Sequence, residues 1–152
     1  MPPSILDPKT ATNLAHRIRT LSPDATRHWG TMTPGAMFCH VADAMEQALG
    51  RRAEVDRSNL FSRTVFKFLM VRVLPMPKGA PTSPAMDASK GGTPPSDFEI
   101  DRRRVLELLE ESRLWPEDVS MAPHPFFGPL TKEERGLLTW KHLDYHLRQF
   151  GG

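Results

Sequence analysis

The spacing of four helix-capping signals along a chain of 152 residues is the feature that most constrains the fold. Each signal is an Asp or Thr before a proline, or a Ser or Thr with a glutamate three residues later: Asp7-Pro8, Thr33-Pro34, Ser96 with Glu99, and Thr131 with Glu134. Both arrangements suit the free N–H groups in the first turn of a helix. A long connection, from Arg51 to Pro95, separates the second signal from the third. We therefore expect an all-α fold, a four-helix bundle with one long crossover between its second and third helices.

Apolar residues recur at helical spacing after each signal, and proline or glycine follows the last of them. The stops are Ser22-Pro23, Gly50, Trp115-Pro116 and the final pair Gly151-Gly152. The expected helices end near Leu21, Leu49, Leu114 and Phe150. We expect residues 1–152 to form a single domain, which at this length needs no disulfide or structural metal to hold it.

The crossover itself divides into two parts of different composition. Leu60 to Leu74 is rich in Phe and Val, and Ser58 is placed to cap it as an extra helix. A strand is the alternative for its second half, but we favour a helix because no partner strand is evident elsewhere in the chain. Prolines and glycines then crowd Pro75 to Ser96, which predicts a long irregular loop. Such a loop could be a lid, a brace or an arm that binds a partner.

Composition excludes several classes of protein. The formal charge is +2, from 20 basic and 18 acidic side chains, so we expect no binding of nucleic acid. The most apolar stretch, Val65 to Leu74, is too short and too charged to span a membrane, so no membrane association is expected. No amino-terminal signal peptide is evident. Cys39 is the single cysteine, which rules out an internal disulfide and favours the reducing cytoplasm.

Histidines suggest the chemistry of this chain. His142 and His146 are four residues apart in the last expected helix, so both imidazoles lie on one face, with Gln149 on the same stripe. A single pair of this kind is weak evidence for a metal site, because solvated or core-edge histidines show the same spacing. His40 lies on the apolar stripe of the second helix, where a lone histidine is usually a hydrogen-bonded core residue.

The rise of a helix decides whether these three histidines can meet. His40 lies about 10 Å from the start of its helix, and His142 and His146 lie about 12 and 6 Å from the end of theirs. If the second and fourth helices are antiparallel, all three reach one level; if they are parallel, they miss by roughly 9 Å. One long crossover makes those two helices antiparallel, so the expected topology is up-down-down-up.

Three neutral imidazoles with a position left open form the pattern of a catalytic zinc site. Nickel, copper or iron would also accept imidazole nitrogen. Ligating histidines usually donate their second N–H to a carboxylate or carbonyl, and Asp43, one turn beyond His40, is the nearest candidate. His124 is a further candidate for a group that surrounds and supports the metal ligands. A loop histidine that is hydrogen-bonded to the backbone is an equal alternative.

Three segments of the chain resemble the DinB-like superfamily, and more narrowly a branch labelled a domain of unknown function. The segments are His40 to Ala44, His124 to Thr131, and His142 to Gly151. The resemblance covers the chain from about Asp7 to Gly152. It implies an up-down-down-up bundle that binds a divalent metal, often zinc or nickel, through His40, His142 and His146. It also implies a homodimer and, from characterised relatives, transfer or isomerisation chemistry with a low-molecular-weight thiol. Tyr145 stands where such proteins often carry another histidine, which is not expected to be a ligand.

Two classes of function follow from this sequence. The first is a divalent-metal-dependent enzyme, a thiol transferase or a hydrolase, acting on a small molecule. In this enzyme Tyr145 and Gln149 would touch substrate or bound water, and Phe126 with Phe127 would wall the pocket. The second is a non-catalytic dimeric bundle that serves as a binding or stress-response module, with a structural metal or none. Both classes are open at this point, since a fold does not determine a function.

Overall fold

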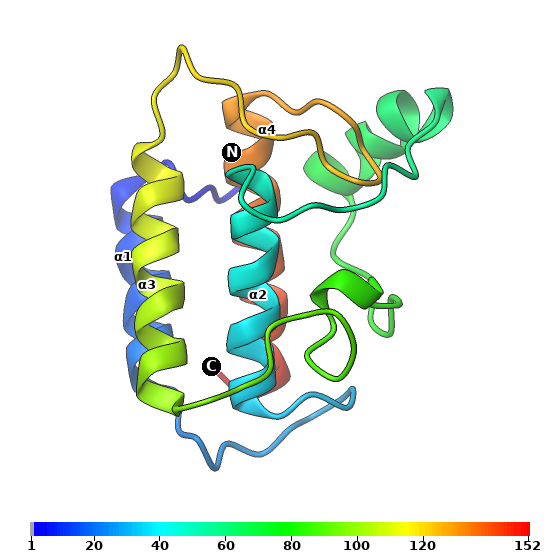
Figure 1. Cartoon of the computed structure of the whole chain (residues 1–152). Helices are drawn as coiled ribbons and strands as arrows, with labels where there is room; N and C mark the ends of the chain where they lie inside the picture. Colours follow the sequence, from blue (N-terminus) through cyan, green and yellow to red (C-terminus); the bar gives the residue numbers. More distant parts are fainter. Residues whose placement is uncertain (1) are drawn as a thin grey trace.

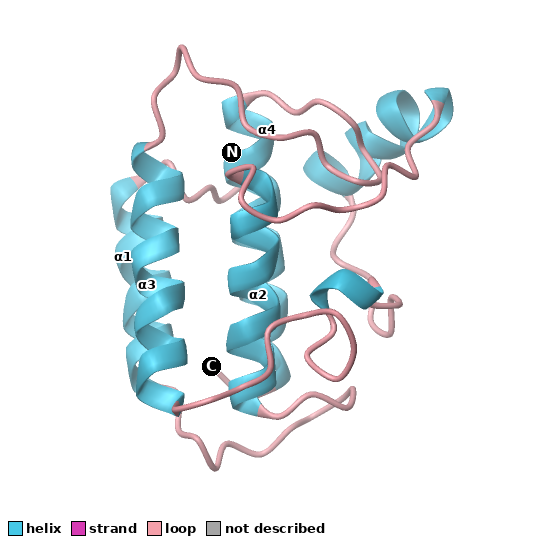
Figure 2. Cartoon of the chain, in the orientation of Figure 1, coloured by secondary structure: helices cyan, strands magenta, loops and turns pink. Residues whose placement is uncertain are grey.

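The computed structural model describes residues 2–152, and its regular elements are helices (Figure 2). Four long helices are present: α1 Pro8–Thr20, α2 Pro34–Ala48, α3 Phe98–Leu114 and α4 Lys132–Gln149. Shorter helical elements lie between α2 and α3: η1 Ser62–Phe66, η2 Leu69–Val73 and η3 Pro84–Met86. No strand occurs within residues 2–152, so the all-α prediction is confirmed. Within the same residues, no helix is both long enough and apolar enough to cross a membrane.

Three of the four predicted caps form as expected. The side chains of Asp7, Thr33 and Thr131 each accept a backbone N–H of the first turn, and Thr131 with Glu134 makes a complete capping box. The predicted cap of α3 is wrong by one residue. Asp97 caps this helix by accepting from the N–H groups of Glu99 and Ile100, because the Ser96 side chain is bound to Asp101.

The long helices run in two opposed directions, as Figure 1 shows. In that view α1 and α4 descend, whereas α2 and α3 rise. Helix α2 packs against α3 and α4, and α1 packs against α3 and α4. Helices α2 and α4 are therefore antiparallel neighbours, which is the condition that the histidine levels require.

The core lies between the four long helices. Its most deeply buried side chains include one or more from every helix: Leu14, Ile18, Phe38, Val105 and Leu147, each at most 1% exposed. Full burial of a side chain of this size stabilises the fold by about 1.5–3 kcal/mol. The packing of these apolar residues fixes the separation of α2 and α4, on which the histidine cluster depends.

The first part of the crossover is a helix from Leu60 to Val73, which confirms the helix and excludes the strand. Much of it is wound as π-helix. Its cap is Asn59 rather than Ser58. The Asn59 side chain accepts the Ser62 N–H at 3.0 Å, and the Ser62 hydroxyl accepts the Asn59 N–H at 2.8 Å. Ser58 hydrogen-bonds Asp56 instead.

Candidate metal centre

His40 from α2 meets His142 and His146 from α4 at a single point. The Nε2 atoms of His40 and His142 are 2.9 Å apart. The ring centroids of the three imidazoles are 4.8 or 4.9 Å from one another, and each residue offers a ligand nitrogen within 4.8 Å of the others. The expected convergence is present because α2 and α4 are antiparallel and the two α4 histidines are one turn apart.

Two of the three imidazoles are held in a defined tautomer by carbonyl oxygens. His146 Nδ1 lies 3.0 Å from Oε1 of Gln149, and His40 Nδ1 lies 3.0 Å from the carbonyl oxygen of Met86. Carbonyl oxygens only accept, so both Nδ1 atoms carry the proton. Both Nε2 atoms therefore present a lone pair, which is the form that binds a metal ion.

Gln149 is itself fixed by the loop that precedes α2. Its Nε2 donates to the carbonyl oxygen of Trp29 at 2.8 Å, which turns Oε1 toward His146. Gly30 makes this approach possible. It has a φ of +80°, and a Cβ at this position would lie 2.3 Å from the Gln149 amide nitrogen. A glycine in the loop thus determines the orientation of a histidine on α4.

Burial keeps the cluster uncharged near neutral pH. Desolvation, followed by the neighbouring His40, lowers the pKa of His146 to about 3. Desolvation lowers the pKa of His40 as well, and that of His142 falls well below its usual value for the same reason. Neutral imidazole is the species that ligates a metal, so these shifts favour binding.

The hydrogen bond between the Nε2 atoms of His40 and His142 requires that one of these two nitrogens carry a proton. Since His40 Nε2 carries a lone pair, the donor across the 2.9 Å contact is Nε2–H of His142. His142 must therefore move this proton to Nδ1 before all three Nε2 atoms can face one cation. The donor set fits a divalent metal after that single change.

Tyr145 lies beside the cluster, with its ring centroid 5.0 Å from that of His146. Its hydroxyl accepts from Trp29 Nε1 at 3.1 Å and from the Gly79 N–H at 3.4 Å. Lys78 places its ammonium 4.2 Å above the Trp29 ring. Tyr145 therefore links the histidines to the Pro/Gly-rich loop, and its own hydroxyl proton remains available for donation.

Asp43 does not hold His40. This carboxylate is fully buried and accepts from the N–H and hydroxyl of Thr93, while Arg104 and Arg52 pair with it at 2.9 and 3.1 Å. The Met86 carbonyl takes the place that we expected Asp43 to fill. Asp43 instead ties the far end of the loop to α2.

His124 lies in the connection between α3 and α4. Its Nδ1 accepts from the N–H groups of Phe126 and Phe127 at 3.1 and 3.3 Å, as in the backbone-bonded alternative. Burial, with the nearby Arg135, lowers its pKa to about 3. Phe126 is 45% exposed, with the Arg57 guanidinium 5.8 Å from its ring centroid.

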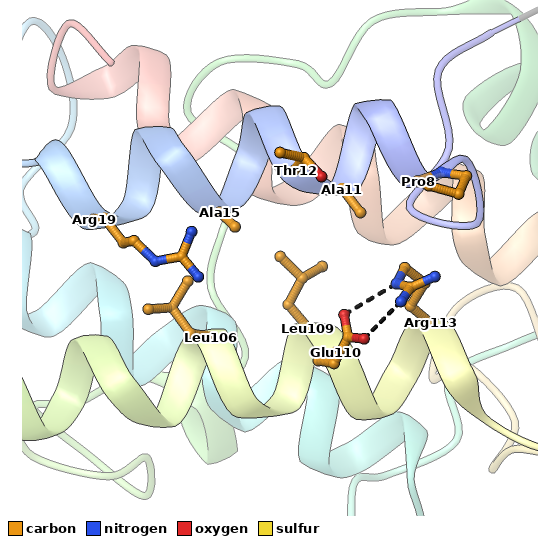
Figure 3. A pocket seen from close by; sticks show the side chains of 9 residues that line it. All are labelled: Pro8, Ala11, Thr12, Ala15, Arg19, Leu106, Leu109, Glu110 and Arg113. Carbon is orange, nitrogen blue, oxygen red and sulfur yellow. Dashed lines mark hydrogen bonds and ion pairs between the residues drawn. The ribbon is translucent and has the colours of Figure 1, made fainter.

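A separate groove of about 220 Å³ lies between α1 and α3 (Figure 3). Ala11 and Ala15 leave space opposite Leu106 and Leu109, and the groove also contains an ion pair between Arg113 and Glu110. Figure 3 shows none of the three clustered histidines on its walls. The groove offers an ion pair and apolar carbons but no set of convergent ligands, so we place the candidate function at the histidines.

Sequence reasoning did not find three of the groups around the cluster: the Met86 carbonyl, Trp29 and Lys78. Any residue supplies a carbonyl, so nothing in the sequence could mark Met86. Trp29 directly precedes Gly30 in the short connection between α1 and α2. A tryptophan next to a glycine was the one sequence signal that could have marked Trp29. Gln149 was found, but its role here is to orient His146.

Comparison with known proteins gives one relationship. No match was found among curated proteins, and none among solved structures. Residues 4–151 match the family described as a protein of unknown function (DUF1569), and because the match spans nearly the whole sequence, the chain belongs to this family.

Proposed function

We propose that this protein binds one divalent metal ion through Nε2 of His40, His142 and His146, with zinc the first candidate and nickel the second. The convergence of the three imidazoles from two helices supports this assignment. So do the fixed Nδ1 protons of His40 and His146, which pre-organise two ligands before any ion arrives. The helix directions fit the DinB-like up-down-down-up bundle.

We further propose that the protein is a metal-dependent enzyme acting on a small molecule, with a low-molecular-weight thiol as the leading class. A divalent ion at three imidazoles supplies Lewis acidity, which holds a thiol as thiolate or makes water nucleophilic. Gln149 and the Met86 carbonyl orient the ligands, and Tyr145 donates its hydroxyl proton to a bound substrate. The reducing cytoplasm is the compartment in which free thiols are abundant.

One observation carries the proposal: neutral imidazoles from two antiparallel helices lie in contact, with ring nitrogens 2.9 Å apart. A cluster built only for packing would gain more from apolar side chains, because buried polar groups are costly unless each finds its partner. Metal binding is the function that makes use of three convergent nitrogens.

Elemental analysis of purified protein tests the metal. Wild type should carry about one equivalent of zinc or nickel, and the triple variant His40→Ala, His142→Ala, His146→Ala should carry none. Equal metal content in the two proteins would rule out this site.

Cobalt substitution then tests the chemistry. Co²⁺ at an open site should change its visible absorption when a small thiol or azide is added, because the added ligand enters the coordination sphere. A spectrum that no added ligand perturbs would contradict the enzyme while leaving the metal site intact.

A non-catalytic binding module is the second candidate, and the burial of the site favours it. His40 and His146 are only 8% and 6% exposed. A closed structural metal site would then stabilise the bundle without reaching substrate. For a closed structural site, we expect that an added thiol or azide leaves the cobalt spectrum unchanged. We also expect that removal of the metal by a chelator lowers the unfolding temperature of the protein.

A further inference from the structure

Arg135, in the first turn of α4, is a buried cation without a carboxylate partner. Its side chain is 5% exposed, and among residues 2–152 it is the one basic side chain of Lys or Arg that is buried. None of the ion pairs formed by these residues includes it. Burial lowers its pKa to about 10, so the guanidinium is still charged at neutral pH. A buried charge is costly unless an opposite charge compensates it.

Hydrogen bonds within the protein satisfy this guanidinium only in part. Nη2 of Arg135 donates to the carbonyl oxygen of Ala122 at 2.6 Å. Nε is fully covered and has no acceptor in the part of the chain that the structure describes. A guanidinium carries five N–H donors in a planar fork, so donors remain for a further ligand.

The carboxylates nearest in sequence are engaged elsewhere. Glu133 pairs with Arg72 at 3.1 Å. Glu134 pairs with Lys67 at 3.5 Å. Both carboxylates therefore join α4 to the crossover helix and leave the charge of Arg135 uncompensated.

His124 offers a second donor near this guanidinium. Its Nδ1 accepts from the N–H groups of Phe126 and Phe127, so the proton of the neutral ring is on Nε2. The ring stacks on that of Phe127, with the centroids 4.6 Å apart. The backbone of His124 exchanges two hydrogen bonds with Gly128, both 2.9 Å long. Its Nε2–H therefore points in a fixed direction.

Two observations place His124 and Arg135 close together. Burial and then the charge of Arg135 lower the pKa of His124 to about 3. The segment that carries His124 is also tied to Arg135 through Ala122, whose own N–H donates to the carbonyl of Ala48 at 2.8 Å. The end of α2, the connection before α4 and the first turn of α4 thus meet at this guanidinium.

A purely structural role explains only part of this arrangement. The Ala122 carbonyl holds Arg135 near the C-terminal end of α2, where the helix dipole favours a cation. The dipole supplies only about half an elementary charge, spread over several carbonyl groups. A carboxylate or phosphate would supply a full charge, and its paired oxygens match the guanidinium fork.

We propose that Arg135 and His124 bind one oxyanion, the carboxylate or phosphate group of a small molecule, between the first turn of α4 and the connection that precedes it. Arg135 supplies the charge and the fork of donors, and His124 supplies its Nε2–H. Arg135 lies two turns, about 10 Å, before His142 along α4. The site uses none of the three clustered histidines, so it stands whether or not the protein binds a metal.

Isothermal titration calorimetry with sodium phosphate and with sodium acetate tests the site, with chloride holding the ionic strength constant. A neutral chelator in every sample prevents a metal ion at the histidines from binding the anion. Wild type should bind at least one of the two anions. In Arg135→Met the dissociation constant should rise at least about 10-fold, because the variant keeps the apolar stem and loses the charged fork. Tighter binding of phosphate would identify a phosphate ligand, and tighter binding of acetate a carboxylate ligand.

The matched control is Arg103→Met, which removes the same charge from an exposed position on α3 and should bind as wild type does. Arg135→Lys is a second variant that keeps the cation but loses the fork, so its dissociation constant should rise about 3-fold or more. Circular dichroism checks the fold of each protein. Two results would overturn the proposal: wild type that binds neither anion, or Arg135 variants that fold and bind as tightly as the control.

Discussion

Gln149 connects the loop before α2 to a histidine on α4 through the two ends of one amide. Its nitrogen binds the Trp29 carbonyl and its oxygen binds His146. Outer partners of this kind set the tautomer and the direction of a ligating imidazole. The affinity of the site should therefore depend on residues that never touch the ion.

Replacement of Gln149 by leucine tests this dependence. The variant keeps the size of the side chain but releases Nδ1 of His146, so metal affinity should fall by about 10–100-fold. The measurement is zinc competition against a chromophoric chelator. Gln47→Leu is the control, because Gln47 is buried and donates to one loop carbonyl, that of Pro123, at 2.9 Å. Equal loss of affinity in both variants would show that general destabilisation is the cause.

Substitution of Gly30 by alanine should damage the same connection by steric contact. The new Cβ would displace the Gln149 amide, and the left-handed backbone adds strain of about 1–3 kcal/mol. Urea unfolding should show reduced stability, and zinc affinity should fall as well. Gly50→Ala separates the two effects, since Gly50 has a φ of +76° and no atom within 4 Å of its Cβ position. That variant should lose stability and keep its zinc affinity.

The loop from Pro75 to Ser96 acts as an element because two of its attachments to α2 lie near the cluster. Asp43 fixes it at Thr93, and His40 contacts it at Met86. Arg52 adds bonds to the Ala85 carbonyl and the Thr93 hydroxyl, at 3.1 and 2.8 Å. The loop is therefore a brace that holds the Met86 carbonyl against His40, which corresponds to one of the three roles that its composition left open.

Removal of the Asp43 carboxylate should loosen this brace. In Asp43→Ala two guanidinium groups lose their buried partner, which costs about 3–5 kcal/mol. Urea unfolding measures the loss, and hydrogen exchange at the Thr93 amide should accelerate. The contrasting variant is Glu111→Ala, which breaks an exposed pair with Arg51, and exposed pairs of this kind contribute little to stability. A similar cost in both variants would contradict the bracing role.

Local signals predicted the helices well and the loop contacts poorly. The capping box of Thr131 with Glu134 was correct because its partners are adjacent in sequence. At α3 two capping residues competed, and Asp97 took the end because Ser96 was drawn to Asp101. Helix rise, together with the long crossover that makes α2 and α4 antiparallel, sufficed to predict that the three histidines meet. The Met86 carbonyl and the π-helical winding depend on tertiary packing, which no short sequence pattern records.

Buried neutral histidines link the stability of the whole molecule to pH. The pKa values of His40, His124, His142 and His146 are all lowered by burial, those of His124 and His146 to about 3. Below pH 6.5 the histidines of the unfolded chain bind protons, whereas the same histidines in the folded chain do not. The free energy of unfolding therefore decreases progressively as the pH falls from 6.5 toward 3.

Metal-free protein should consequently unfold in mild acid. Each of the four histidines contributes a slope of up to about 1.4 kcal/mol per pH unit below pH 6.5, because a shift of one pKa unit corresponds to that free energy. Urea unfolding in the presence of a chelator, from pH 7.5 to 4.5, measures the slope. The triple variant His40→Gln, His142→Gln, His146→Gln retains only His124 among the four, so its slope should be clearly shallower than that of wild type. Saturating zinc should raise the stability of wild type at pH 7.5 in proportion to the logarithm of its concentration and leave the variant unchanged. Parallel slopes for the two proteins would show that the clustered histidines take up protons as readily in the fold as in the unfolded chain, which would contradict their burial as neutral imidazoles.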